Sequence, residues 1–318
     1  MLPHLPEITL IFTSLFIQGL PFLFLGALIS GLVSSFLPIE KLIAWMPRHP
    51  LKSACLGLCA GLVFPSCECI GLPLVRRLTR KGLPLSAGLA YLFAGPAINP
   101  IALSSTWLAF SFEDPITAIC LRLIGAILIA LILALSLHRM GRTWVLRPEV
   151  LATTPTNEHL AQSPVIAASW LQARFPRLAN AVQITLVDFL NVSLFYIFGA
   201  LIAATVQTMG STFLNQTGTG LLGIPLMMLA AILSSVCSSA DAFVAKSYVN
   251  VSLAATFAFL WIGPVLDLKL IVIYHSFFQR RAIVLLTILT LVSVFLLALA
   301  LSVIPADYLN AIYWSTQR

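Results

Sequence analysis

Long apolar runs separated by short polar stretches dominate the chain. Four of them are long enough to cross about 30 Å of hydrocarbon, which takes about 20 residues of helix: residues 8–37, 116–137, 184–209 and 282–304. A helix satisfies its own backbone hydrogen bonds, so it can cross lipid, which offers no partners. The pattern therefore predicts an all-α, polytopic membrane protein.

The composition agrees with this prediction. Hydrophobic residues make up 59% of the 318 residues, charged residues only 9%, and the mean hydropathy is +1.00, far outside the range of soluble domains. The first apolar run lacks a preceding basic residue and is about twice as long as a signal-peptide core, so we expect a retained first helix. The six cysteines all lie in or beside apolar segments, which favours free thiols over a disulfide framework.

Two halves of the chain share an ordered pattern. The segment "FIQGLPFLFLGALISGLV" from Phe16 is matched by "FLNVSLFYIFGALIAATV" from Phe189, and "PLSAGLAYLFAGPAINP" from Pro84 by "SLAATFAFLWIGPVLDL" from Ser252. Between these blocks Cys67 aligns with Cys237. The three matches in one order predict a duplication: a transmembrane repeat over residues 1–140, a cytoplasmic basic linker over 141–181, rich in proline, and a second transmembrane repeat over 182–318.

Each repeat is expected to contain an intact helix, an interrupted segment with cysteine, a second interrupted segment with the dipeptide Gly-Pro, and a closing helix. If the cysteine segments enter and leave on one face, 14 of the 18 basic residues gather on one side, as the positive-inside tendency favours. The acidic corner at Glu113 and Asp114 then lies outside. This arrangement has six crossing helices and two re-entrant segments, and its rival has eight full spans.

Prolines mark the predicted helix breaks, at Pro65, Pro96, Pro100 and Pro264. Backbone groups freed by such breaks are tolerated only against protein or a water-filled cavity. In transporters built from inverted repeats, paired breaks form the substrate site from helix ends. We therefore expect these four breaks to surround a cavity.

The first break carries soft ligands. Cys67 and Cys69 flank Glu68, and Cys237 occupies the position related by the repeat. Thiolates prefer copper(I), zinc, or thiophilic arsenic and antimony species, so these three sulfurs form a candidate metal or metalloid site. The alternative is a tight helix crossing of small residues, for which the nearby glycines also argue.

Carboxylates and an amide complete the candidate substrate site. An ionisable side chain at membrane depth is costly and indicates function by default, so Glu68 is a candidate for proton exchange. Asp241 and Asp267 are its counterparts in the second half, although Lys269 lies close enough to Asp267 for a purely structural ion pair. Asn99, between two prolines, can donate and accept hydrogen bonds and is expected to line the cavity rather than only form a turn.

Four other positions have weaker assignments or none. Cys55 and Cys59 are four residues apart on one helix face, where packing is a better interpretation than a second thiol site. Cys120 and Arg122 lie near the outer end of a predicted span. The sequence pattern assigns neither of them a role.

The string "FPSCECIGLPLVRRLTRKGLPLSAGLAYLFAGPAINPIALSST" resembles the signature of the bacterial predicted-permease family that includes the organoarsenical efflux permeases. The likeness extends to "SSVCSSADAFVAKS" in the second half. It implies a multi-pass transporter of the bacterial inner membrane, an exporter, with signature positions at Cys67, Glu68, Cys69, Pro96, Asn99 and Pro100. Arsenic is one substrate lead that the resemblance provides, and divalent metals are another.

We therefore expect a proton-coupled or gradient-driven exporter of a soft metal or metalloid, with membrane lipid around it, no cofactor and no nucleic-acid partner. The chain contains no phosphate-binding G-x-x-x-x-G-K-[ST] motif. An enzyme is disfavoured because the five histidines lie at segment ends or in the linker, away from the cysteines that would need a base. A passive channel or a permease for an unrelated small solute remains the alternative.

Overall fold

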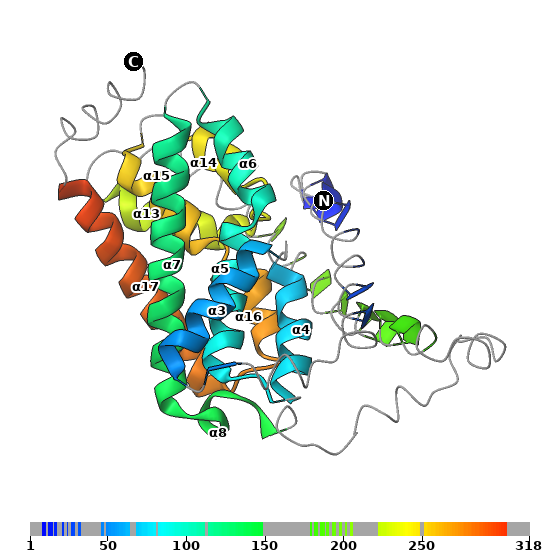
Figure 1. The fold of residues 1–318 in the computed structure, drawn as a ribbon. Coiled ribbons are helices and arrows are strands. Elements are labelled where there is room, and N and C mark those ends of the chain that lie inside the picture. The colour runs from blue at the N-terminus through cyan, green and yellow to red at the C-terminus, as the bar shows by residue number, and fades with distance from the viewer. Residues whose placement is uncertain are drawn as a thin grey trace.

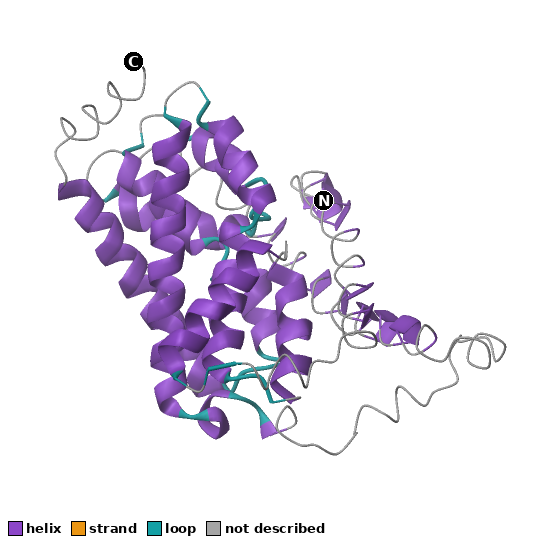
Figure 2. Ribbon diagram, in the orientation of Figure 1, coloured by secondary structure: helices purple, strands orange, loops and turns teal. Residues whose placement is uncertain are grey.

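The computed structural model describes mainly the helical core of the protein. It covers residues 49–63, 68–80, 82–111, 114–148, 222–248 and 251–303, with scattered positions between 8 and 47 and between 179 and 205. These residues form helices joined by short connections, and they contain no β-strand apart from one isolated bridge (Figure 2). Three described helical segments have the length and composition to cross a membrane: Leu85–Ala109, which is interrupted at residue 99, Pro115–Met140 and Arg280–Val303. The all-α prediction is confirmed, and these segments are consistent with a membrane protein.

The described helices follow a similar order in the two halves (Figure 1). In the first half they are α3 (Pro50–Val63), α4 (Glu68–Arg80), α5 (Leu85–Ile98), α6 (Pro100–Ala109), α7 (Pro115–Met140) and the short α8 (Arg142–Val145). In the second half they are α13 (Gly223–Ser234), α14 (Asp241–Ser247), α15 (Leu253–Ile262), α16 (Leu268–Tyr274) and α17 (Arg280–Val303). Two short helices with a gap between them are thus followed by an interrupted pair and one long helix in each half.

Helix α3 packs closely along α5, and both run in the same direction. Gly57 faces Ala87 and Gly61 faces Gly95, so the two sequences advance together. The approach is tight, because a Cβ atom added to Gly57 would lie 2.3 Å from the carbonyl oxygen of Ala87. Small residues permit such close helix contacts in membranes.

Helix α4 lies along α5 in the opposite direction. Its first turns approach Leu92, which lies near Gly71, whereas its last turn approaches the start of α5, where Thr79 lies near Gly88. Helices α3 and α4 therefore form a hairpin whose two open ends lie at the same end of the molecule (Figure 1). With 14 and 13 residues, each is shorter than the stretch of about 20 residues that spans a bilayer.

The long helices α7 and α17 run in opposite directions. After α7 the chain forms an antiparallel bridge between Leu146 and Phe278, directly before α17 begins. The amide of Gln279 donates to the carbonyl of Val145 at 3.0 Å. This end of the molecule, at the bottom of Figure 1, carries the arginines at positions 139, 142, 147, 280 and 281, and we call it the basic end.

Aromatic contacts identify the opposite end of the molecule. Phe110, at the end of α6, stacks on Phe257 of α15 with ring centroids 6.0 Å apart. The ammonium group of Lys246, in the last turn of α14, lies 5.2 Å from the centroid of the Phe110 ring. The α6–α7 and α14–α15 connections therefore lie together at this opposite end.

The two halves contact each other in a reciprocal way. Helix α6 packs against α14, and α4 packs against α16, so a helix that follows one kind of break meets a helix that follows the other kind of break in the other half. Helix α7 also packs against α15 and α17. Every residue of α5 is buried, as are all those of α15 after Leu253. A helix that is apolar all round belongs in the protein interior rather than at its surface, so these two helices form the core.

The structure agrees with some of the predicted boundaries and corrects one. The apolar runs 116–137 and 282–304 lie in α7 and α17, apart from residue 304, which is not described. The runs 8–37 and 184–209 and most of the linker lie largely outside the described residues. Helix α5 continues through Pro96 and ends at Ile98, so the predicted break at Pro96 is wrong. Pro96 cannot donate the hydrogen bond that a helical residue makes to the carbonyl four positions earlier, and α5 ends two residues after it.

Candidate functional site

The break between α5 and α6 is centred on Asn99. Proline disfavours helical backbone in the residue before it, and Asn99, which precedes Pro100, is extended, with φ −66° and ψ 153°. Its side-chain oxygen accepts a hydrogen bond from the amide of Ala102 at 2.7 Å, which caps α6. Its side-chain nitrogen donates to the carbonyl of Pro96 at 3.0 Å. Asn99 is buried and spans both sides of the break.

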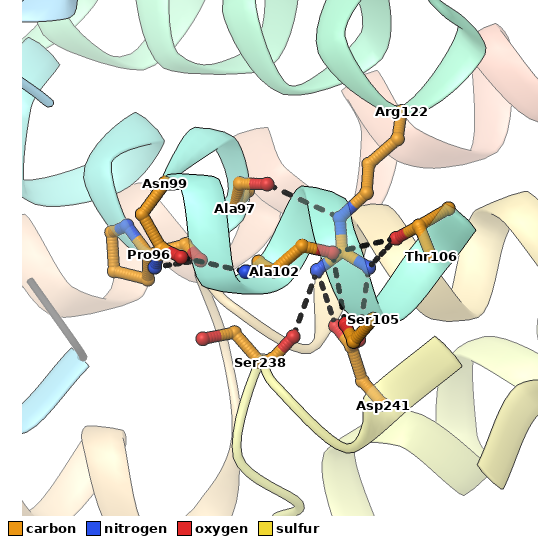
Figure 3. A network of polar contacts seen from close by, with 9 residues as sticks. All are labelled: Pro96, Ala97, Asn99, Ala102, Ser105, Thr106, Arg122, Ser238 and Asp241. Carbon is orange, nitrogen blue, oxygen red and sulfur yellow. Dashed lines mark hydrogen bonds and ion pairs between the residues drawn. The ribbon is translucent and has the colours of Figure 1, made fainter. Parts of the chain in front are cut away.

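A second side chain satisfies another carbonyl at this break. The last four carbonyls of a helix lack intrahelical partners, and that of Ala97 accepts from Nε of Arg122 on α7 at 3.1 Å. Nη1 of Arg122 also donates to the hydroxyl of Thr106 on α6 at 2.9 Å. Arg122 thus binds both helices of the interrupted pair (Figure 3).

The same arginine reaches the second half of the chain. Its guanidinium forms a bidentate ion pair with Asp241 at the start of α14, with Nη1–Oδ1 at 2.9 Å and Nη2–Oδ2 at 2.8 Å. Nη2 also donates to the carbonyl of Ser238 at 3.1 Å. Both charged side chains are buried, with whole-residue exposures of 0% for Arg122 and 1% for Asp241. A charge buried to this extent is stable only when it is paired and hydrogen-bonded, and here every guanidinium nitrogen has a partner.

A second buried ion pair lies at the start of α16. Asp267 caps this helix by accepting from the amide of Leu270 at 2.6 Å, and it pairs with the ammonium group of Lys269 at 3.1 Å. The ammonium group also donates to the carbonyl of Ser235 at 3.0 Å. The structural ion pair considered for Asp267 is therefore present. Asp267 and Asn99 each cap the second helix of an interrupted pair.

These two cations stabilise the break between α13 and α14, which contains Cys237. Ser235 has a left-handed backbone, with φ 46° and ψ 36°, a conformation that costs free energy for residues other than glycine. Lys269 binds the carbonyl of Ser235 and Arg122 binds that of Ser238. Cys237 lies between these two attachment points and is half-buried. Its backbone carbonyl accepts from the amides of Ala240 and Asp241.

The first cysteine break is only partly described. Pro65 and Cys67 lie outside the described residues, and Glu68 and Cys69 are described only as the first backbone positions of α4. Pro264 lies in the buried turn between α15 and α16. Among the side chains that the structure does place, no group of three or more His, Cys, Asp or Glu is arranged to hold a metal ion. The proposed sulfur set of Cys67, Cys69 and Cys237 therefore stays a prediction.

Neighbouring contacts place the end of α3 near the break that contains Cys237. A Cβ atom added to Gly61, in the last turn of α3, would lie 3.5 Å from Cδ1 of Ile98. Ile98 directly follows Ala97, whose carbonyl accepts a hydrogen bond from Arg122. Arg122 in turn binds Ser238 beside Cys237. The end of α3 and the break at Cys237 therefore both adjoin the C-terminal end of α5. Cys55, Cys59 and Cys120 are exposed on the described surface.

Arg122 is the central residue that the sequence analysis missed. Its signal was present, because an arginine within an apolar helix of 26 residues is rare and costly at membrane depth. The pattern did not identify its partner, since Asp241 is 119 positions away along the chain. The same reasoning that selected Glu68 would have selected Arg122.

Comparisons with known proteins agree with a transport fold. Residues 4–303 match the model of a family described as "Predicted permease". The chain is 31% identical over 285 residues to UPF0718 protein YcgR of Bacillus subtilis, covering 88% of this chain and 92% of that protein. It is 32% identical over 287 residues to a putative two-component membrane permease complex subunit of Streptococcus mutans, covering 88% and 91%. No solved structure matches.

Proposed function

This chain belongs to the predicted permease family, and on that premise we propose that it is a secondary transporter of the bacterial inner membrane that exports a soft metal or metalloid species. The family and the apolar helices indicate a membrane transporter rather than an enzyme. The substrate, the direction of transport and the energy source are the parts of the proposal that experiments must establish.

One observation carries the proposal of a solute pathway. Interrupted helices from the two halves meet at Arg122, which binds the α5–α6 break and the α13–α14 break at the same time. Breaks at membrane depth occur where the backbone faces protein or a wet cavity, and paired breaks form the midplane sites of transporters with inverted repeats. The pathway is therefore proposed to run beside this junction.

The helix directions support a topology with six crossing helices and two re-entrant segments. Helices α3 and α4 form a hairpin that opens at the basic end. Helices α7 and α17, which close the two halves, are antiparallel. Antiparallel closing helices are expected for an inverted repeat and not for the rival parallel repeat of eight spans. The arginines of the basic end then face the cytoplasm.

The substrate class follows from the thiols. The carbonyl oxygens of Ser235 and Ser238, on either side of Cys237, accept hydrogen bonds from Lys269 and Arg122. The half-buried thiol of Cys237 is therefore the group of this break that is proposed to bind the substrate. Cys67 and Cys69 would contribute further sulfur from the first break. Sulfur donors suit arsenic(III), antimony(III) and soft metal ions better than alkali cations.

Glu68 is the proposed carrier of the coupling proton. Asp241 and Asp267 were candidates for the same role, but their carboxylates are bound by Arg122 and Lys269. A carboxylate at the N-terminal end of α4 could exchange a proton as the pathway opens to alternate sides. Proton exchange is therefore proposed at residue 68.

Uptake into inside-out vesicles tests this function. Wild-type protein should accumulate at least one of methylated arsenic(III), arsenite, antimonite, zinc and copper(I), more strongly with a pH gradient than without. Cys67→Ser and Cys237→Ser should reduce uptake of the same species, and Glu68→Gln should remove the dependence on the gradient. Cys120→Ser, which changes a thiol at the described surface, is the matched control and should transport normally.

Three outcomes would contradict parts of the proposal. Uptake that is unchanged by both thiol substitutions would exclude sulfur coordination. Uptake that never exceeds equilibrium under any gradient would indicate a channel rather than a coupled transporter. If none of the five species is carried, the proposed substrate class is wrong.

A further inference from the structure

The Arg122–Asp241 junction lies between Cys237 and the end opposite the basic end. Arg122 is seven residues after Pro115, the first residue of α7, which corresponds to about 10 Å of helix rise. Asp241 begins α14, and Lys246 near the end of that helix contacts Phe110 at the opposite end. Helices α6 and α14 pack against each other over this stretch. Any path from Cys237 to the opposite end along α14 must pass this contact.

The junction joins the two halves of the chain at their broken helices. Arg122 forms hydrogen bonds with two elements of the first half, through Ala97 and Thr106, and with two positions of the second half, Ser238 and Asp241. Lys269 holds the other side of the same break, where it binds Ser235 and Asp267 of the second half. The Arg122–Asp241 pair thus links α14 to α7 and, through Thr106, to α6.

We propose that Arg122 is a positioning residue that closes the solute pathway on the side of the opposite end, and that its ion pair with Asp241 separates when the pathway opens there. The proposal rests on the transport function proposed above. In the closed arrangement α14 is held against α6 and α7. Movement of α14 away from α7 breaks the bidentate pair and exposes Cys237 to that side.

A purely structural role makes a different prediction. If the pair only stabilises the fold, its removal loosens the break in every direction, and Cys237 becomes accessible from both sides or from neither. If the pair closes one side, removal raises accessibility from that side alone. The direction of access therefore distinguishes the two roles without any knowledge of the substrate.

The test measures the labelling rate of Cys237 by a membrane-impermeant thiol reagent. The other five cysteines are replaced by serine, and Ser111→Cys and Met140→Cys, introduced separately, report the opposite and the basic side. In Arg122→Gln/Asp241→Asn, where no unpaired charge remains, labelling from the Ser111 side should rise about tenfold, which corresponds to a shift of about 1.4 kcal/mol toward the open state. Labelling from the Met140 side should not change.

Two further variants make the result decisive. Lys269→Gln/Asp267→Asn removes the other buried ion pair of the same break, and it should give no rise in labelling that is confined to the Ser111 side. Arg122→Lys keeps the charge but loses the fork that binds two partners, and it should give a smaller rise on the same side. This variant decides the question if the double variant does not fold, as judged by size-exclusion chromatography.

Three results would overturn the proposal. The labelling rate of Cys237 in the Arg122 variants could rise equally from both sides, or it could fail to rise at all. The Lys269 variant could also show the same one-sided rise as the Arg122 variants. Because the readout is thiol access, these results do not depend on transport. A one-sided rise together with no uptake of any tested species would retain the closing role and reject the proposed substrate class.

Discussion

At the scale of single residues, buried side chains replace the hydrogen bonds that the broken helices lose. Asn99 and Arg122 satisfy carbonyls at the end of α5, and Lys269 and Arg122 satisfy those around Cys237. The sequence analysis selected Asn99, between two prolines, as a cavity-lining residue, a role that stays a prediction, and it considered the Lys269 ion pair as the structural alternative for Asp267. It did not predict the Arg122–Asp241 pair, because nothing local links two residues so far apart.

Asn99 provides the first residue-scale prediction. Asn99→Ala removes the cap of α6 and the donor to Pro96, and should reduce the free energy of unfolding by about 1–2 kcal/mol. Asn99→Ser keeps an uncharged oxygen that can cap the amide of Ala102, so its loss should be smaller. Thermal unfolding of the purified protein in detergent measures both. Equal losses would show that the cap contributes nothing.

Arg122 provides the second residue-scale prediction. Arg122→Gln leaves Asp241 buried without its cation, and such a change costs about 3–5 kcal/mol of stability. Adding Asp241→Asn should recover a large part of this loss, because the carboxylate no longer needs a partner. The two single variants and the double variant form a cycle, measured by unfolding in detergent. Additive losses would mean that the two residues do not interact.

At the scale of helices, the order of elements followed from the apolar pattern, whereas break positions needed local backbone chemistry. Two prolines flank Asn99, and only the second ends the helical backbone, since its ring restricts the residue before it. Pro96 falls in the last turn of α5 and does not itself end the helix. The α13–α14 break contains no proline, and its left-handed Ser235 was not predicted.

Packing between α7 and α15 provides the prediction at this scale. A Cβ atom at Gly125 would lie 2.1 Å from the indole of Trp261, whose Nε1 donates to the carbonyl of Leu121 at 3.2 Å. Gly125→Ala should therefore displace Trp261 and destabilise the protein by about 1–3 kcal/mol. Gly263→Ala is the control, since its nearest contact would be an ordinary 3.4 Å. Equal melting temperatures for both variants would contradict this packing.

At the scale of the whole molecule, the proposed topology predicts which loops share a side of the membrane. Lys52 in the first turn of α3 and Arg80 at the end of α4 are exposed, and both lie at the open end of the hairpin. Cysteines placed there in a cysteine-free background should react with an impermeant reagent from the same side, and a cysteine at Ser111 from the other. Opposite-side labelling at positions 52 and 80 would support eight full spans.

The overall architecture was predictable only in outline. The length of the apolar runs predicted the closing helices of the two halves, α7 and α17, and the distribution of basic residues favoured one orientation in the membrane. The reciprocal packing of α4 on α16 and of α6 on α14 depends on contacts between distant segments, which apolar patterns do not encode. The internal repeat stays a prediction, supported by the matching helix order and the antiparallel long helices.

The central claim is that the cysteine breaks of the two halves face one pathway, and a cross-link between Cys67 and Cys237 tests it most directly. A variant with only these two cysteines and a protease site in the linker is treated with a short bifunctional thiol reagent, then cleaved and separated on a denaturing gel. The account predicts that the two halves remain joined, and that a cysteine at the exposed Val303 of α17, in place of Cys237, leaves them separate. Two halves that separate although both thiols react singly would contradict it.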